Sequence, residues 1–207
     1  MKKLMRDPEL KKQEILSTAQ KLFETHGYEN TSVEQIIREL DISKGAFYHY
    51  FESKKDLLIL LVEQFSSAME NIFKSIVETE NLNALEKLKL LIRGPEKEAK
   101  VADPLMAIIH KPDNRELQER LTICVIKKLA PLIAKVLEQG NQERLFHAET
   151  PLQTAQLLMA SSQFLLESDL FDWESQEKLE LLKALQTMLE RSIKAEEGSM
   201  SFIVKRS

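Results

Sequence analysis

The sequence has little of what builds a disulfide framework, a membrane span or a sheet. Its 207 residues include one cysteine, which excludes an internal disulfide. With only five glycines and six prolines, no segment shows the apolar and polar alternation of a strand. The longest apolar run, residues 57–62, is far shorter than the roughly 20 residues that span a bilayer, and the N-terminus lacks the apolar core of a signal peptide. These absences predict a cytoplasmic protein without a membrane partner.

Catalytic and metal-binding motifs are also missing. There is no glycine-rich phosphate loop, no G-x-S-x-G turn and no H-E-x-x-H pair. Cys124 lies in an apolar stripe, which favours a core position, with a redox-sensing thiol as the alternative. We therefore expect that the protein is not an enzyme and has no metal site and no cofactor. The histidines are too scattered to indicate metal binding and stand at His26, His49, His110 and His147.

Long leucine-rich segments interleaved with glutamate and lysine dominate the chain, which is 43% hydrophobic and 30% charged. This composition predicts an all-α fold, and the spacing of apolar residues divides the chain into about nine helices. The net charge of −4 is uneven, because residues 1–55 carry ten Lys and Arg against nine Asp and Glu, and the remainder nineteen against twenty-four. The more basic part is therefore N-terminal, as expected for a domain that binds a polyanion.

Three helix caps lie close together in the N-terminal part. Thr31 and Glu34 have the spacing of a reciprocal capping box and predict a short helix that begins there. Ser43 is placed to cap a second helix from residue 44 to about 50, and Ser53 with Asp56 to cap a long third one. Two short helices joined tightly at residues 41–42 predict a helix-turn-helix over about residues 32–51.

The second short helix is suited to a polyanion. Its exposed residues are donors or small, and no carboxylate occurs between Ser43 and Phe51. Lys, Tyr and His can contact phosphate oxygens, and small residues at the tip allow a helix to enter a major groove. We expect Phe47 and Phe51 in the core. Tyr48 and Tyr50 are predicted to contact phosphate, with burial in the core as the alternative.

This stretch resembles the signature of the TetR-type transcriptional regulators. The signature reads Gly-aromatic, Thr, I-A-x-x-A-G-V-S-K-G, L-Y-x-Y-F and S-K-x-x-L. Ile37 stands where the family usually has Ala, and Leu40-Asp41 where it usually has Ala-Gly. The resemblance covers about residues 9–57 and implies a three-helix DNA-binding domain over residues 1–55 and a helical effector-binding and dimerisation domain over residues 56–207. The residues that correspond to the signature are Gly27, Tyr28, Thr31, Ile36, Ile37 and residues 40–45, 47–51 and 53–57.

The resemblance also implies contacts with a double-stranded DNA operator. Lys44, Gly45 and Ala46 would approach base edges. Lys54 is the strongest candidate for a phosphate contact, because helix N-termini attract anions. Lys2, Lys3 and Arg6 add a short basic arm at the N-terminus. The full set of residues implied to contact phosphate is Thr31, Ser32, Tyr48, His49, Tyr50 and Lys54.

Helix boundaries elsewhere follow from caps and breakers. A first helix over about residues 9–26 should end at Gly27 as a left-handed C-cap. Asn83 with Glu86 should open a helix that ends at residues 94–95, and a short helix is expected over residues 103–112. The long helix over about residues 53–77 is predicted to bury Leu58, Leu61, Phe65, Ala68 and Ile72.

A further helix is expected from residue 113 or 114 to about 139, with Gly140 as its stop. Pro131 lies inside it and should kink or split it. The next helix should begin with Thr150 as cap, Pro151 as first residue and Gln153 completing a capping box, and run to about residue 168. A last helix should begin between residues 172 and 175, and the tail after residue 198 should be frayed.

The last two predicted helices have apolar stripes wider than one neighbour covers, which predicts a homodimer. An intramolecular bundle is the alternative. In the family, the corresponding helices of two subunits form a four-helix bundle, and the two-fold symmetry implies an inverted-repeat operator. Candidate interface residues are Leu158, Leu165, Leu182, Leu185 and Leu189.

The resemblance further implies a small, mostly apolar effector among the middle helices. We therefore predict a repressor that binds its operator as a homodimer and is released by the effector. The alternative is a helical DNA-associated or protein-interaction module without an effector. Candidate lining residues, each of which also fits an ordinary core position, are Phe65, Met69, Met106, His110, Cys124, Met159, Gln163, Phe164 and Trp173.

Overall fold

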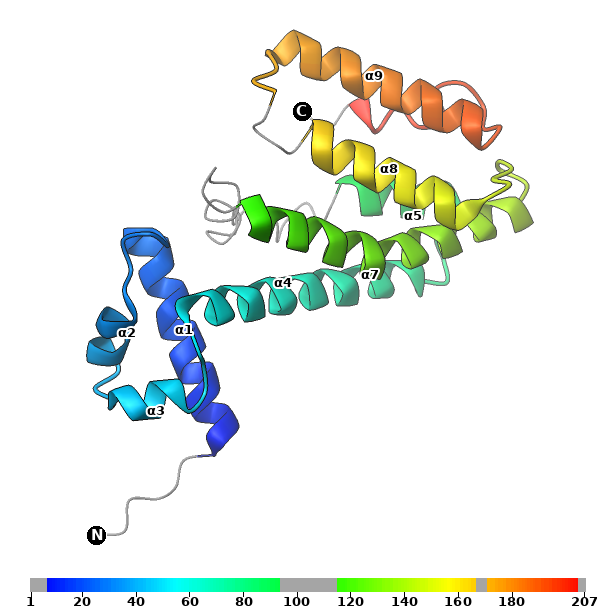
Figure 1. The fold of residues 1–207 in the computed structure, drawn as a ribbon. Helices are drawn as coiled ribbons and strands as arrows, with labels where there is room; N and C mark the ends of the chain where they lie inside the picture. Colours follow the sequence, from blue (N-terminus) through cyan, green and yellow to red (C-terminus); the bar gives the residue numbers. More distant parts are fainter. Residues whose placement is uncertain (1–6, 94–114, 167–170, 205–207) are drawn as a thin grey trace. The chain divides into compact units, whose positions relative to one another are not determined.

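The computed structural model describes residues 7–93, 115–166 and 171–204, and within these ranges it is helical with no strand. The predicted all-α fold is confirmed, while the predicted helix over residues 103–112 lies outside the described residues. Figure 1 shows α1 (Pro8–His26), α2 (Val33–Glu39), α3 (Lys44–Tyr48), α4 (Lys54–Val77), α5 (Ala84–Arg93), α7 (Arg115–Gln142), α8 (Pro151–Leu165) and α9 (Ser175–Ser192).

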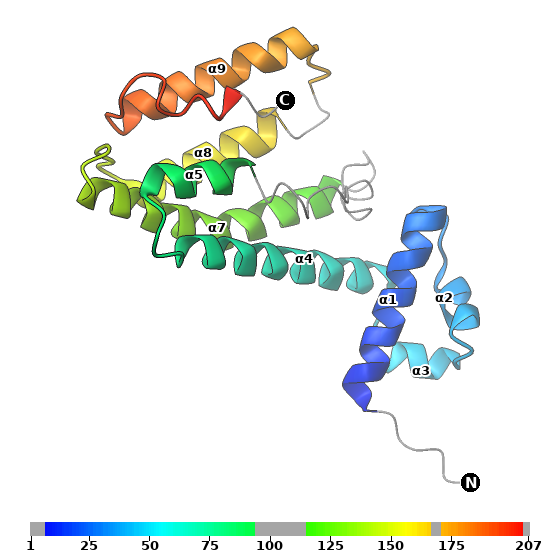
Figure 2. The same cartoon turned by 180° about the vertical axis from the view of Figure 1, so that it is seen from behind.

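The chain forms two compact units, one of residues 1–65 with 102–118 and one of residues 66–101 with 119–207. Helix α4 begins in the first unit and ends in the second. In the second unit, α8 lies between α7 and α9, as the views from both sides agree (Figures 1 and 2). Among the described residues, we find no helix with the length and apolar character needed to cross a membrane.

Helix α1 is defined by its two ends and one apolar face. The Asp7 carboxylate accepts a hydrogen bond from the Glu9 amide at 3.0 Å. The helix ends at His26 as predicted, and Gly27 follows at φ 82° and ψ 154°, a positive-φ conformation that favours glycine. The predicted glycine C-cap is therefore confirmed in its position and its positive φ, although its ψ lies far from that of a left-handed helix. The buried face consists of Ile15, Leu16, Ala19 and Phe23.

The cap of α2 lies one residue later than predicted. Ser32 Oγ accepts from the Gln35 amide (3.1 Å), and the Gln35 side chain accepts from the Ser32 amide (2.6 Å). Thr31 is buried, with its hydroxyl 2.8 Å from the Gly27 carbonyl oxygen and 3.2 Å from that of Leu22. The predicted capping box at Thr31 is wrong, because that hydroxyl bonds the end of α1 and the neighbouring serine caps α2.

The turn between α2 and α3 places Asp41 at φ 48°, a left-handed conformation that favours glycine. The Ile42 amide donates to the Ile37 carbonyl oxygen across this turn at 3.2 Å. The TetR-type motif usually has glycine where Asp41 stands. The turn therefore keeps the backbone conformation of the motif while its sequence departs from it.

Replacing Asp41 with glycine should stabilise the protein. Removing the Cβ relieves the strain of the left-handed conformation, but glycine also gives the unfolded chain more conformational freedom. The net increase in the free energy of unfolding should be about 0.5 kcal/mol. Thermal unfolding followed by circular dichroism measures the change. The matched variant Asp41→Ala keeps the Cβ and should be no more stable than the original protein. An Asp41→Gly variant that unfolds at a lower temperature than the original protein would contradict the inferred strain at Asp41.

Helix α3 begins and packs as predicted. Ser43 Oγ accepts from the Ala46 amide at 3.1 Å, which caps the helix. Phe47 and Phe51 are buried, at 0% and 4% exposure, and hold α3 against the core of the first unit. The helix ends at Tyr48, two residues before the expected end.

The start of α4 is also confirmed. The Asp56 carboxylate accepts from the Ser53 amide (3.0 Å), and Ser53 Oγ accepts from the Asp56 amide (3.2 Å). Ala68 is exposed, so its predicted burial is wrong. The buried stripe of the later part of α4 runs through Ser66 and Phe73 instead, along another side of the helix.

In the second unit, α5 begins as predicted. Asn83 and Glu86 exchange side-chain and backbone hydrogen bonds of 2.8 Å and 3.0 Å. Lys87 is buried, and its ammonium donates to the Val77 carbonyl oxygen (2.7 Å) and to Gln139 Oε1 (2.9 Å). This lysine satisfies a carbonyl at the end of α4 and ties α4, α5 and α7 together.

Helix α7 is longer than predicted. It continues through Pro131 as one element, so the predicted split is not seen, and through Gly140 to Gln142, so the predicted stop is wrong. Gly140 is buried, and a Cβ added to it would overlap three carbon atoms of the Phe146 ring. The glycine is explained by this close approach and not by a helix end.

The cap of α8 differs from the prediction, whereas α9 begins where expected. Thr150 makes no side-chain capping bond, because its ψ of 74° is not that of a cap, so the predicted box with Gln153 is wrong. Pro151 does take the first helical position. Glu174 and Glu177 form a reciprocal capping box at the start of α9.

The described part of the tail, residues 199–204, is packed, which contradicts the predicted fraying. Met200, Phe202 and Ile203 are buried, at 0%, 8% and 2% exposure. Glu190 of α9 is buried as well, and its carboxylate accepts from the Met200 amide (2.8 Å) and from Gln186 Nε2 (2.9 Å). Three apolar side chains and a buried hydrogen bond therefore hold the tail in the second unit.

Candidate DNA-binding face

The outer side of α3 presents donors and small side chains. Tyr48 is 45% exposed, although it is an aromatic residue beside the buried Phe47. This exposure agrees with the predicted phosphate contact and excludes the alternative of a core tyrosine. Tyr50 is half-buried, with its ring 4.9 Å from that of His49. The exposed residues of the stretch are Ser43, Lys44, Gly45, Tyr48 and His49, and Ala46 is half-buried.

One acidic residue lies close to this face. Glu34 of α2 approaches Lys44 Nζ to 3.6 Å, with both side chains about two-thirds exposed. Lys44 Nζ also lies 5.9 Å from the centre of the Tyr48 ring. An exposed pair of this kind stabilises the fold by roughly 0–1 kcal/mol, so a phosphate can replace the carboxylate. Sequence reasoning missed Glu34 because the folding of α2 against α3 brings it to Lys44.

Among the residues that the structure describes, Gly45 makes no packing contact that requires a glycine. A Cβ added to it would meet nothing within 4 Å, and Gly45 is absent from the positive-φ positions. Glycine inside a helix is about 1 kcal/mol less favourable than alanine. The fold therefore gains nothing from this glycine, whereas close approach of another molecule would require it.

Two residues of the predicted phosphate set are used inside the first unit. Thr31 is buried, and its hydroxyl already bonds carbonyl oxygens, so we remove it from the candidate face. The Lys54 ammonium donates to the Tyr28 carbonyl oxygen at 2.6 Å and lies 4.1 Å from the centre of that ring. Burial lowers the pKa of Lys54. Ser32 is exposed and stays in the set, while the basic arm over residues 2–6 lies outside the described residues.

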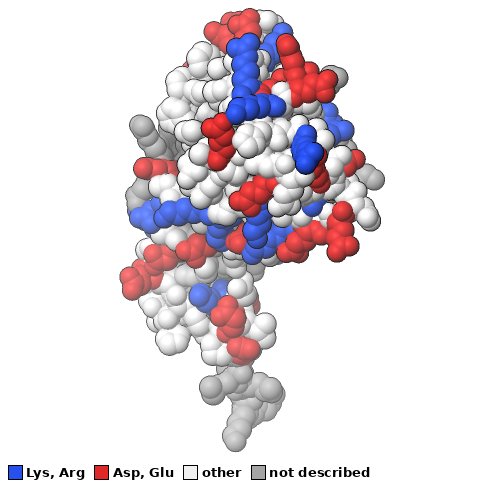
Figure 3. Space-filling view, turned by 90° about the vertical axis from the view of Figure 1, so that its right-hand side faces the viewer, with Lys and Arg blue, Asp and Glu red and all other residues white. Residues whose placement is uncertain are grey.

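Charge on one face of the molecule is mixed. On the side shown in Figure 3, basic and acidic side chains are interspersed and form no large area of one sign. This pattern agrees with the small net charge of −4. This face therefore offers no broad basic surface for a polyanion.

The predicted effector residues are spread over both units. Phe65 belongs to the first unit, and Met106 and His110 lie outside the described residues. In the second unit, Cys124 Sγ lies 3.2 Å from Ser66 Oγ, a buried hydroxyl of α4. Met159 is buried, and Met69, Cys124, Gln163 and Trp173 are half-buried.

Phe164 and Trp173 are joined through Phe171. The Phe171 ring is stacked on Trp173, with centres 5.2 Å apart, and meets Phe164 edge to face at 5.5 Å. Trp173 Nε1 donates to the Leu165 carbonyl oxygen at 3.0 Å, which satisfies the end of α8. Phe164 is 55% exposed, so it lies at the surface of the chain and not in its core.

The predicted dimer residues differ in their exposure. Leu158 and Leu189 are buried within the single chain, at 9% and 3% exposure, because they face its own core. Leu165, Leu182 and Leu185 are half-buried. The most exposed apolar side chains of α8 and α9 are instead Leu157 (70%), Phe164 (55%) and Met188 (54%).

Helix α8 contains no charged residue, although much of it is exposed. A solvent-facing helix normally carries charges on its outer side, so their absence indicates a covered face. This signal was available in the sequence over residues 151–165. The absence of charge points to the outer face of α8 as the candidate interface, whereas apolar spacing alone selected residues that are buried in the chain.

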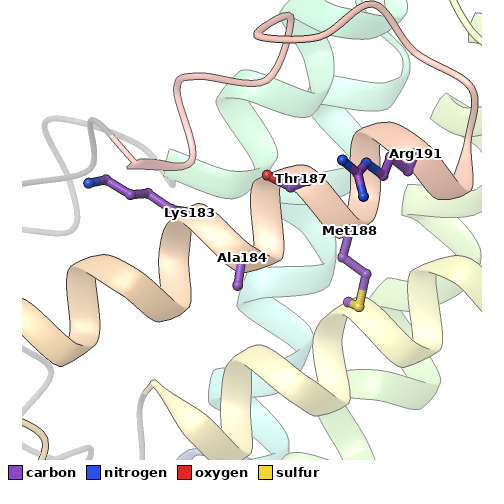
Figure 4. A pocket seen from close by; sticks show the side chains of 5 residues that line it. All are labelled: Lys183, Ala184, Thr187, Met188 and Arg191. Carbon is purple, nitrogen blue, oxygen red and sulfur yellow. The ribbon is translucent and has the colours of Figure 1, made fainter.

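A shallow hollow of about 560 Å³ lies on α9. Figure 4 shows its five lining side chains along one stretch of the helix, with Ala184 and Met188 on one side. None of the predicted effector residues lines it. The lining residues are Lys183, Ala184, Thr187, Met188 and Arg191.

Comparison with known proteins gives matches over both units. Residues 15–61 match the model of bacterial regulatory proteins of the tetR family, and residues 99–187 match the tetracyclin repressor-like C-terminal domain. YuxN of Bacillus subtilis, an uncharacterized HTH-type transcriptional regulator, is 51% identical over 51 residues, 25% of this chain and 18% of YuxN. The chain spans 18% to 32% of the lengths of the first curated relatives that it matches.

Solved structures share the fold over nearly the whole chain. A TetR-family transcriptional regulator from Pectobacterium atrosepticum matches 92% of this chain and 98% of its own, with a TM-score of 0.68 and 20% identity. RolR in complex with resorcinol matches 97% of this chain and 95% of its own, with a TM-score of 0.61 and 17% identity. The two family models and these folds agree with the helix-turn-helix described above. The chain belongs to the tetR family of bacterial regulatory proteins.

Proposed function

We propose that this regulator is a homodimeric repressor whose α3 enters the major groove of an inverted-repeat operator. Residues 1–55 form its DNA-binding domain and residues 56–207 its effector-binding and dimerisation domain. Gly45 carries this proposal, because the glycine lies at the outer tip of α3 and the fold has no need of it. Lys44, Gly45 and Ala46 approach base edges, and the phosphate contacts come from Ser32, Tyr48, His49 and Tyr50.

The proposed dimer uses the outer faces of α8 and α9. Leu157, Phe164 and Met188 are its apolar anchors, supported by the lack of charge on α8. The hollow on α9 adds Ala184, a small side chain that permits a close neighbour. Two-fold symmetry places two α3 helices about 34 Å apart, one turn of duplex, which is why the operator is expected to be an inverted repeat.

The proposed effector is small and mostly apolar. RolR, which shares the fold, is named with resorcinol, a small aromatic ligand. In this chain, the half-buried Met69, Cys124, Gln163 and Trp173 and the buried Met159 support a site in the second unit. Because α4 belongs to both units, an effector that favours one arrangement of α4 would release the operator through a coupling of roughly 1–3 kcal/mol.

Selection of DNA sequences with the purified protein at two salt concentrations tests the proposal, with its mass measured by light scattering. We expect an inverted repeat bound by a dimer, with affinity falling as salt rises. Lys44→Ala should lower operator affinity about tenfold, as expected for one base or phosphate contact. Lys21→Ala, which removes an exposed lysine from α1, is the matched control and should bind normally. Failure to enrich any sequence would contradict the proposal.

Gly45→Ala should separate DNA binding from stability. The free energy of unfolding should rise by up to about 1 kcal/mol, because alanine favours a helix more than glycine does. Its operator affinity should fall about tenfold, because the added methyl group keeps α3 from the DNA. Thermal unfolding and operator titration measure the two effects. A variant that binds as tightly as the original protein would exclude close approach at Gly45.

A further inference from the structure

Lys54 closes a loop around the whole helix-turn-helix. Its ammonium reaches back 26 residues to the Tyr28 carbonyl oxygen, at 2.6 Å. Both short helices, α2 and α3, lie between these two residues. A bond that joins the ends of a segment limits the arrangements of everything between them. Lys54 is therefore placed to restrict α2 and α3 together.

The other end of this loop is the turn at Tyr28–Thr31, which hydrogen bonds and ring packing hold in place. The Tyr28 carbonyl oxygen also accepts from the Thr31 amide at 3.2 Å, and the Tyr28 ring packs edge to face on Phe23, with centres 5.2 Å apart. Phe23 is fully buried in α1. Thr31 fixes the same turn through its own hydroxyl. Lys54 thus fastens α4 to a turn that α1 already holds.

The ammonium of Lys54 is occupied on two sides. It donates to a carbonyl oxygen, and it lies 4.1 Å from the centre of the Tyr28 ring, well within the range of a cation–π contact. Burial lowers the pKa of Lys54 and raises that of Tyr28, where nearby Glu29 and Asp56 act in the same direction. Of the three donors of the ammonium, one is used by the Tyr28 carbonyl oxygen, and the ring covers a second side. The Lys54 side chain therefore makes structural contacts within the DNA-binding domain.

We propose that Lys54 is a positioning residue that sets the presentation of α3, and not a phosphate contact. The inference rests on the proposed DNA-binding function of α3. It replaces the direct role that the family motif implies for this lysine. Without the Lys54 bond, α2 and α3 stay folded on Phe47 and Phe51 but sample a wider range of orientations, so fewer molecules match the groove.

The salt dependence of operator binding distinguishes the two roles. Lys54→Met keeps the apolar stem and removes the charge, and we expect about a tenfold loss of affinity from the lost cation–π contact and charge-assisted hydrogen bond. The slope of log affinity against log salt should stay unchanged. A lost phosphate contact would instead reduce that slope by about 0.9, which would overturn the proposal. Unchanged affinity would overturn it as well.

Conservative and neighbouring variants sharpen the test. Lys54→Arg should restore most of the affinity, because a guanidinium can stack on Tyr28 and donate to its carbonyl. Lys55→Met removes a charge one residue further along and should have a smaller effect. Tyr28→Leu should weaken binding with the slope unchanged, whereas Tyr28→Phe, which keeps the ring, should bind normally. Tyr28→Leu binding like the original protein would contradict the role of the ring.

Amide hydrogen exchange tests the positioning role without DNA. In Lys54→Met we expect faster exchange over residues 28–54 and unchanged exchange in α8 and α9. Unchanged exchange over residues 28–54 would overturn the proposal even if the protein binds an operator. A wild-type protein that selects no DNA would contradict the proposed function, while the exchange result would still decide whether Lys54 restrains α2 and α3.

Discussion

Replacing Leu157 with lysine should make the protein monomeric and abolish tight operator binding. Leu157 is 70% exposed in the single chain, on a helix without charge, and a lysine there would bring a charge into the proposed interface. A monomer holds only one half-site, so we expect a loss of operator affinity of at least about 100-fold. Light scattering measures the mass, and titration with the selected operator measures the affinity. The helical content should be unchanged, because Leu157 does not contribute to the core.

Leu90→Lys is the matched control for this experiment. Leu90 is 40% exposed in α5, outside the proposed interface, so its replacement should leave both the dimer and the affinity intact. A Leu157→Lys protein that still has the mass of a dimer would move the interface away from the outer face of α8. A dimer lost in both variants would indicate a general loss of structure.

Replacing Gly140 with alanine should destabilise the second unit by about 2–3 kcal/mol, although alanine favours a helix by about 1 kcal/mol. The added methyl group would overlap the Phe146 ring, which is buried at 5% exposure. Because that ring is enclosed, it cannot turn away without disturbing its neighbours. Denaturant unfolding followed by circular dichroism measures the change in the free energy of unfolding.

A smaller side chain opposite Gly140 should rescue the variant. Phe146→Leu alone leaves a cavity and lowers stability, but Gly140→Ala combined with Phe146→Leu should lose less than the sum of the two changes. Gly45→Ala is the control, because open space surrounds that position. Additive losses in the double variant would show that Phe146 is not what the alanine meets.

Local signals in the sequence predicted much of the fold. Ser43, the pair Ser53 and Asp56, and the pair Asn83 and Glu86 cap their helices as expected, because a cap depends on residues three apart. The prediction at residue 31 was wrong because two adjacent residues were able to cap α2. Burial of one of them against α1 decided between them, and a local pattern does not contain that information.

The exposure of the candidate DNA-binding residues was easier to predict than that of the candidate dimer residues. The exposed donors of α3 follow from a short motif, whereas the occupation of Lys54 by Tyr28 depends on a contact across 26 residues. Helical periodicity finds the apolar side of α9 but does not tell which neighbour covers it, so Leu189 was assigned to a second copy. Gly140 was taken as a helix end for a similar reason, because its neighbour Phe146 lies beyond the helix.

The packed tail has a practical consequence for making shortened forms of the protein. Met200, Phe202 and Ile203 are as well buried as the residues of the helices, and the carboxylate of Glu190 depends on the Met200 amide. A protein truncated at residue 198 would leave that carboxylate buried without this hydrogen bond and an apolar surface open to water, which promotes aggregation. Shortened proteins for crystallisation or biosensing should therefore keep the chain through residue 204 and carry any tag beyond it.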